Sequence, residues 1–164
     1  MNGSTEEETM GYTAQQVIDR ADITELTSRY AVAVDAKDWD LYQSLFTADA
    51  VVDYTDALGI VGPMSEILPW LSAALGFCAA TQSNMTSQTV TFRDAANAQA
   101  CTYYIAQHVS LDGEGDEALM LFAGFYQDVL RREGDEWRIA HRVEKGTWLD
   151  GAYPGLIPKN AKHP

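Results

Sequence analysis

Apolar side chains recur at intervals of three and four residues in the first part of the chain. Val17, Ile23, Leu26, Tyr30 and Val34 follow this spacing. It predicts an amphipathic helix over about 13–35 that begins at the N-cap Thr13, either continuous or broken near 20–22. The apolar stripe of this helix is expected to face a core.

Two shorter helices are predicted next. Asp38 is placed to cap a helix over about 39–46. Pro63 opens a third helix over about 64–76, because proline is tolerated where a helix begins. Pro69 lies inside that pattern, so we expect it to kink the helix or to delay its start.

The period changes to two after Gly76, and alternation of apolar and polar residues indicates strands. An earlier, weaker alternation predicts a first strand after a turn at 48–50. The strands are expected at 51–54, 86–92, 98–111, 119–131 and 137–148, with hairpin connections at 112–116 and 133–135. Helices followed by meandering strands indicate an α+β fold, with the helices on one side of a curved sheet and an apolar cavity between them.

The 164 residues suit one domain, which we place at 13–150. An acidic arm at 1–12 and a tail at 151–164 flank it. With 46% hydrophobic residues, a chain of this length can build its core without disulfides or a metal.

The charge balance narrows the classes of partner. Eleven basic and 24 acidic residues give a net charge of −13, which argues against nucleic acid and against anionic membrane surfaces. The chain has two cysteines and three histidines, no apolar run of membrane-spanning length, and an N-terminus that opens acidic. We therefore expect a soluble cytoplasmic protein that uses no metal or nucleotide cofactor.

Five segments carry a family resemblance. Arg29-Tyr30-Ala31-Val32-Ala33-Val34-Asp35-Ala36-Lys37-Asp38-Trp39-Asp40 resembles the first-helix signature of SnoaL-like proteins in the nuclear transport factor 2-like superfamily, which includes scytalone dehydratase and bile-acid 7α-dehydratase. The other four are Leu45-Phe46-Thr47-Ala48-Asp49-Ala50, Val52-Asp53-Tyr54, Thr81-Gln82-Ser83 and Gly134-Asp135-Glu136-Trp137-Arg138-Ile139. The resemblance implies a cone-shaped, mixed sheet wrapped around the N-terminal helices, and assembly into a homodimer or homotrimer.

The resemblance also implies a catalytic site. Asp35, Tyr54 and His108 match the carboxylate, a tyrosine and a histidine of scytalone dehydratase. Ser83 stands where that family has a second histidine. Tyr30 lies one helical turn before Val34, the position of the second tyrosine, and is expected to project into the same cavity.

Further residues are candidates for contact with substrate. Ser83 and Asn84 have polar side chains at the start of a strand, while Tyr104 and Phe122 suit a pocket for aromatic molecules. His141 alternates with Trp137, Ile139 and Val143, so it is expected on the same face as these residues, with Arg142 on the other face. The substrate-binding candidates are Ser83, Asn84, Tyr104, Phe122 and His141; structural roles for each remain the alternative.

Three functions are compatible with these residues. The first is a cofactor-independent lyase in which His108 moves a proton, Asp35 orients it, and Tyr54 with Tyr30 polarises an oxygen of a hydrophobic, aromatic or polycyclic substrate. Elimination of water is the preferred reaction, and elimination of formaldehyde from a hydroxymethyl group would suit the same residues. An isomerase or polyketide-type cyclase comes second, and a binding module without catalysis third.

Overall fold

Six strands form one curved sheet in the computed structural model, which describes residues 11–111 and 117–151. The sheet order is β2-β1-β6-β5-β4-β3, and only the β1–β6 pairing is parallel. The strands are β1 Phe46–Asp53, β2 Val61–Pro63, β3 Cys78–Phe92, β4 Asn97–Leu111, β5 Glu117–Glu133 and β6 Glu136–Gly151. The α+β class and the curved mixed sheet are as expected.

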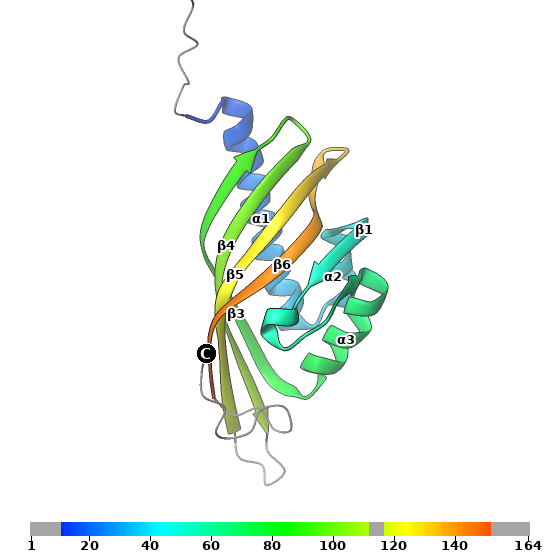
Figure 1. The fold of residues 1–164 in the computed structure, drawn as a ribbon, viewed down its shortest axis with the longest axis vertical. Helices are drawn as coiled ribbons and strands as arrows, with labels where there is room; N and C mark the ends of the chain where they lie inside the picture. Colours follow the sequence, from blue (N-terminus) through cyan, green and yellow to red (C-terminus); the bar gives the residue numbers. More distant parts are fainter. Residues whose placement is uncertain (1–10, 112–116, 152–164) are drawn as a thin grey trace, which may run out of the picture.

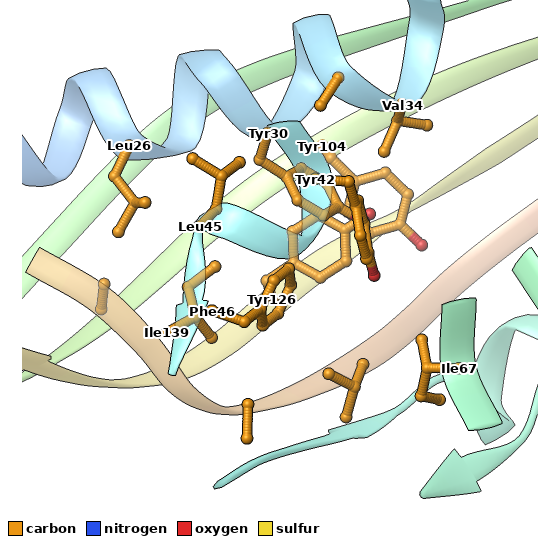
Figure 2. Packing of buried hydrophobic residues seen from close by; sticks show 14 of the residues in the cluster. Leu26, Tyr30, Val34, Tyr42, Leu45, Phe46, Ile67, Tyr104, Tyr126 and Ile139 are labelled. Carbon is orange, nitrogen blue, oxygen red and sulfur yellow. The ribbon is translucent and has the colours of Figure 1, made fainter. Parts of the chain in front are cut away.

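The long helix α1, Ala14–Ala36, runs behind the sheet in Figure 1 and packs against β3 and β6. It is continuous, so the alternative with a break near 20–22 is wrong. Thr13 is its N-cap: Thr13 Oγ1 accepts from the backbone of Gln16, and the Gln16 side chain accepts from the backbone of Thr13. The buried stripe of α1 includes Leu26, Tyr30 and Val34, which Figure 2 shows pointing toward the sheet.

The other helices lie beside β1 and β2. Helix α2, Trp39–Ser44, ends earlier than predicted because the chain enters β1 at Phe46. Helix α3, Met64–Gly76, begins where predicted and continues through Pro69, so the proline does not delay its start. A short 3-10 helix, η1 Thr55–Ala57, precedes β2.

Strand β1 is longer than its sequence pattern indicated. The expected turn at 48–50 is wrong, since these residues lie within β1. A register shift against β6 between Phe46 and Val51 breaks the regular alternation there. Because of that irregularity, a search for alternating apolar and polar residues does not detect the first part of the strand.

A β-bulge in β6 changes which side chains face the interior. Val129 pairs with His141 while Leu130 pairs with Ile139, which leaves Ala140 as the extra residue. Trp137 and Ile139 are buried before the bulge, and Arg142 and Glu144 are buried after it.

The outer face of the sheet carries exposed apolar side chains. Tyr103 and Trp148 are about half exposed, and the rings of Tyr103 and Phe125 pack with their centroids 5.4 Å apart. Ile105, Leu119 and Val129 add aliphatic surface.

Some expectations fall outside the described residues. These are the hairpin at 112–116, most of the arm at 1–12 and most of the tail at 151–164. The proposed domain boundaries therefore stay a prediction. Among residues 11–111 and 117–151, no helix combines the length and apolar character needed to cross a bilayer.

Candidate functional site

A predominantly apolar pocket of about 110 Å³ lies inside the curve of the sheet. Helices α1 and α3, the η1 segment and strands β3 to β6 all contribute to its wall. The lining residues are Tyr30, Val34, Tyr54, Ala57, Leu58, Trp70, Leu71, Ala74, Leu75, Ser83, Tyr104, Ala106, His108, Met120, Phe122, Tyr126 and Glu144. Six of the nine predicted site residues, Tyr30, Tyr54, Ser83, Tyr104, His108 and Phe122, are therefore brought together.

Asp35 lies directly behind this wall, at the end of α1. Its Oδ2 accepts from the backbone N–H of Ser83 at 2.8 Å, and its Oδ1 accepts from Ser83 Oγ at 2.9 Å. Ser83 itself lines the pocket. The serine that stands in place of the histidine thus holds the carboxylate, which is not itself a lining residue.

His108 projects from β4 into the pocket and packs against Phe122, with ring centroids 5.3 Å apart. Its Nδ1 is buried and has no hydrogen-bond partner among the described residues. Burial lowers the pKa of His108 to about 4, although the negative charge of Asp35 opposes this shift. The imidazole is consequently neutral at pH 7 and free to accept a proton.

No hydrogen bond joins Asp35 to His108 in the part of the chain that the structure describes. The expected direct contact, in which Asp35 fixes the tautomer of His108, is not made here. Asp35 acts on His108 through its charge, which favours the imidazolium.

Three phenols meet at the side of the pocket beneath α1. Tyr54 Oη lies 3.0 Å from Tyr30 Oη and 2.9 Å from Tyr42 Oη. Burial raises the pKa of Tyr54 well above its usual range, and the two neighbouring phenols raise it further. The group is therefore an uncharged chain of hydroxyls, and Figure 2 shows the rings of Tyr30 and Tyr42 between α1 and the sheet.

Glu144 is a lining residue that the sequence pattern did not reveal. Its side chain is 7% exposed, and burial raises its pKa to about 7. The nearby Tyr104 hydroxyl opposes this shift, because it stabilises the Glu144 carboxylate. Tyr104 Oη nevertheless has no hydrogen-bond partner among the described residues. Because β6 carries other charged residues, such as Arg138 and Lys145, the sequence holds no clear signal that Glu144 faces the pocket.

Arg142 lies against the ring of Tyr30 and is held there by an ion pair with Asp128. Its Nε and Nη2 donate to the two carboxylate oxygens of Asp128 at 2.8 and 2.7 Å, and both side chains are buried. Its guanidinium lies 4.1 Å from the ring centroids of both Tyr30 and Tyr126. The ion pair is buried and lies on the same face of β6 as Ile139, so the expectation that Arg142 lies on the opposite face is wrong.

Two predicted contact residues lie away from the pocket. Asn84 directs its amide nitrogen to Gln107 Oε1 at 3.1 Å and is not a lining residue. His141 does not line the pocket either, because the bulge at Ala140 moves it to the face opposite Arg142 and Glu144. The expectation for His141 assumed unbroken alternation along β6.

Within the described ranges, no group of three or more His, Cys, Asp and Glu side chains is arranged to hold a metal ion. Cys78 is buried and Cys101 is partly buried, and neither forms a disulfide.

Comparisons with solved structures support the fold. A Kribbella flavida protein superposes with a TM-score of 0.74 at 28% identity, covering 82% of this chain and 95% of that one. A Novosphingobium aromaticivorans protein, provisionally assigned as a scytalone dehydratase, gives 0.76 at 15% identity, with coverages of 93% and 100%. Hexachlorocyclohexane dehydrochlorinase of Novosphingobium barchaimii gives 0.69 at 15% identity, with coverages of 88% and 97%.

Sequence comparison gives the family. An uncharacterized protein of Mycobacterium tuberculosis is 31% identical over 131 residues, which cover 79% of this chain and 86% of that protein. The model of the SnoaL-like domain matches residues 15–143, which is most of the chain. This chain therefore belongs to the SnoaL-like domain family, within the nuclear transport factor 2-like superfamily.

Proposed function

We propose that this protein is a cofactor-independent lyase that eliminates water, or a comparable leaving group, from a hydrophobic cyclic molecule. The observation that carries the proposal is His108, an imidazole that is neutral at pH 7 and has a free nitrogen within an apolar pocket. Such a group is suited to remove a proton from carbon. Two structural neighbours are named for eliminations, a dehydratase and a dehydrochlorinase, so the fold accommodates this reaction class.

Asp35 supports the base electrostatically. When His108 takes a proton, the resulting imidazolium is stabilised by the nearby carboxylate. Ser83 holds that carboxylate by two hydrogen bonds, so the negative charge is already in position before the reaction begins. In this arrangement Asp35 is a positioning residue and His108 is the catalytic residue.

The phenol group supplies polar contacts on the α1 side. Tyr30 and Tyr54 both line the pocket and share a hydrogen bond. Burial raises their pKa values, so they stay protonated. Two of the three phenol protons are used within the group, which leaves one to donate to an oxygen of the substrate. The apolar remainder of the wall, including Trp70, Leu71 and Phe122, favours aromatic or polycyclic substrates.

The experiment incubates the protein with a panel of hydroxylated aromatic and polycyclic ketones and analyses the products by mass. Loss of one water or of formaldehyde supports a lyase. A product of unchanged mass but altered retention identifies an isomerase or cyclase instead. Binding without any product would leave only a binding module, and both of these outcomes would overturn the proposal.

The residue assignment is tested with matched histidine variants. His108→Ala should reduce turnover by about 10²- to 10⁴-fold, the usual contribution of a positioned general base. His141→Ala removes a histidine outside the pocket and should leave turnover at the wild-type level. Equal turnover in the two variants would contradict the role given to His108.

A further inference from the structure

The pocket contains a second polar position, away from His108. Tyr104 and His108 are four residues apart on the same face of β4, which has no register shift against β5. At about 3.3 Å per residue, their backbones are about 13 Å apart. Tyr104 and Glu144 therefore line a different part of the pocket wall from His108.

Tyr104 and Glu144 are brought together by the packing of three strands. The Tyr104 ring stacks on Tyr126, with centroids 4.6 Å apart and planes inclined by 17°. Tyr126 is in turn the register partner of Glu144 across β5 and β6. All three side chains are buried and all three line the pocket.

The Tyr104 hydroxyl has unused hydrogen-bonding capacity. Its Oη is buried without a partner among the described residues, and the Glu144 carboxyl is buried near it. A buried hydroxyl without a partner is costly, and native proteins rarely leave one. Its position on the wall of a pocket indicates that a ligand atom completes it.

We propose that the carboxyl of Glu144 and the hydroxyl of Tyr104 together donate hydrogen bonds to a carbonyl or enolate oxygen of the substrate. This inference rests on the proposed function and narrows its substrate class. The substrate is a conjugated ketone whose oxygen lies at Tyr104 and Glu144 and whose reacting C–H lies near His108.

A conjugated elimination would couple the two positions. His108 takes the proton, the C–H bonding pair moves into the conjugated system, and the ketone oxygen becomes an enolate that accepts both hydrogen bonds. When the enolate collapses, its electrons return to form the new C=C bond and the C–O bond to the leaving hydroxyl breaks. The departing oxygen takes the proton back from His108 as water, so atoms and charge balance.

The surroundings of Glu144 favour its protonated form near neutral pH. Burial raises the pKa of Glu144 to about 7, Tyr104 and Arg142 oppose the shift, and Asp56 adds to it. Asp56 is itself paired with Lys145 at 3.3 Å. The titratable and charged groups that act on Glu144 or respond to it are Tyr30, Tyr42, Tyr104, Tyr126, Arg142 and Asp56.

Binding of a ketone that does not ionise tests the inference without turnover. The probe is 2-acetylnaphthalene, and 2-ethylnaphthalene is the hydrocarbon control of similar shape. We expect the wild-type protein to prefer the ketone by about tenfold near pH 6, in proportion to one or two hydrogen bonds gained. That preference should decline as the pH rises through about 7 and Glu144 loses its proton.

Three variants separate hydrogen bonding from packing. Glu144→Gln keeps a donor that does not titrate, so its preference for the ketone should persist to pH 9. Tyr104→Phe removes a donor that is present at every pH and should reduce the preference throughout. Glu144→Leu removes a donor that the wild type has only below about pH 7, so it should reduce the preference near pH 6. Equal affinity for ketone and hydrocarbon in the wild type, or a preference independent of pH, would overturn the inference.

Two further outcomes are informative. A stronger affinity for 2-naphthylmethylamine than for the ketone would mean that Glu144 binds cations as a carboxylate, which also overturns the inference. If the ketone is preferred as expected but no substrate of the panel is turned over, the hydrogen-bonding site stands and the lyase proposal fails. Turnover that depends on His108 but comes without a ketone preference would instead support the lyase and overturn the hydrogen-bonding site.

Discussion

Ser83 binds both carboxylate oxygens of Asp35, one through its backbone N–H at 2.8 Å and the other through Oγ at 2.9 Å. Strand β3 is thereby joined to the end of α1 at the wall of the pocket. The backbone contact survives any substitution of Ser83 that keeps an N–H, so the side-chain contact can be tested alone.

Ser83→Ala should lower the free energy of unfolding by about 1–2 kcal/mol, because it removes one hydrogen bond to a charged group. Urea unfolding monitored by circular dichroism measures this. Ser87→Ala, at an exposed position on the same strand, is the matched control and should cost less. Equal losses would mean that the Ser83 hydroxyl contributes nothing to holding Asp35.

His108 should make the protein less stable in acid. Its pKa in the folded state is about 4, below its ordinary value of 6.5, so the unfolded chain binds a proton in this range before the folded chain does. The stabilising contribution is complete above pH 6.5 and is lost as the pH falls toward 4. Its size is on the order of 2 kcal/mol.

His108→Gln should flatten this part of the stability profile, whereas His141→Gln should keep the wild-type loss between pH 6.5 and 4. Chemical unfolding at several pH values provides the comparison. An unchanged acid profile in His108→Gln would show that the histidine is not held in its neutral form.

Glu144 should make the protein less stable as the pH rises, the opposite of the effect of His108. Its pKa rises from 4.5 to about 7 on folding, so its contribution is fully present below pH 4.5 and is lost as the pH increases through 7. Glu144→Gln should therefore gain stability relative to the wild type between pH 5 and pH 8, by on the order of 3 kcal/mol. Glu25→Gln, on the exposed surface of α1, should show no such gain, and a gain independent of pH would contradict the assignment.

The pair Arg142 and Asp128 should be sensitive to loss of one partner. Arg142→Met leaves the Asp128 carboxylate buried without its bidentate partner and should cost about 3–5 kcal/mol. The double variant Arg142→Met with Asp128→Asn should cost less than the sum of the single changes. Arg131→Ala, which removes an exposed pair with Asp49, is the control and should change little. Additive costs would argue against a coupled pair.

We propose that the outer face of the sheet contacts a second copy of the chain, as the family resemblance implies. Exposed aromatic and aliphatic groups such as Tyr103 and Trp148 favour association. Light scattering after size-exclusion chromatography should give the mass of two or three chains, and Tyr103→Glu with Trp148→Glu should give one. A wild-type mass of one chain would refute this proposal.

The sequence predicts α1, α3 and most of β4, β5 and β6 because each has several turns or alternations of consistent period. Strand β3 was expected only at 86–92 but begins at Cys78, and register shifts against β4 interrupt its first half. The N-cap at Thr13 and the apolar stripe from Ile23 to Val34 are confirmed, whereas Val17, the first residue of the predicted stripe, is exposed. Short or irregular elements lack that redundancy. Strand β2 has three residues, and β1 carries a register shift, so neither gives a clear period.

In the candidate site too, residues on regular elements were predicted and residues beyond an irregularity were not. Residues on regular elements, such as Tyr30 on α1 and His108 on β4, are found at the pocket where the sequence places them. Their chemical roles remain predictions. Glu144 was missed and His141 was misplaced for one reason, which is that pairing geometry decides the facing of side chains beyond the bulge at Ala140.

That bulge makes the chemical character of the cavity a matter of strand pairing as well as residue type. If β6 paired regularly through Ala140, alternation would continue from Ile139, and the imidazole of His141 with Val143 would face inward. The guanidinium and the carboxyl that now lie beneath the phenols would then face outward. Ala140 is the extra residue at the bulge. Its position thus determines whether this end of the pocket is acidic or carries a second histidine. Two pocket chemistries are therefore available to a strand of the same length and sequence, and the choice between them is made by the backbone.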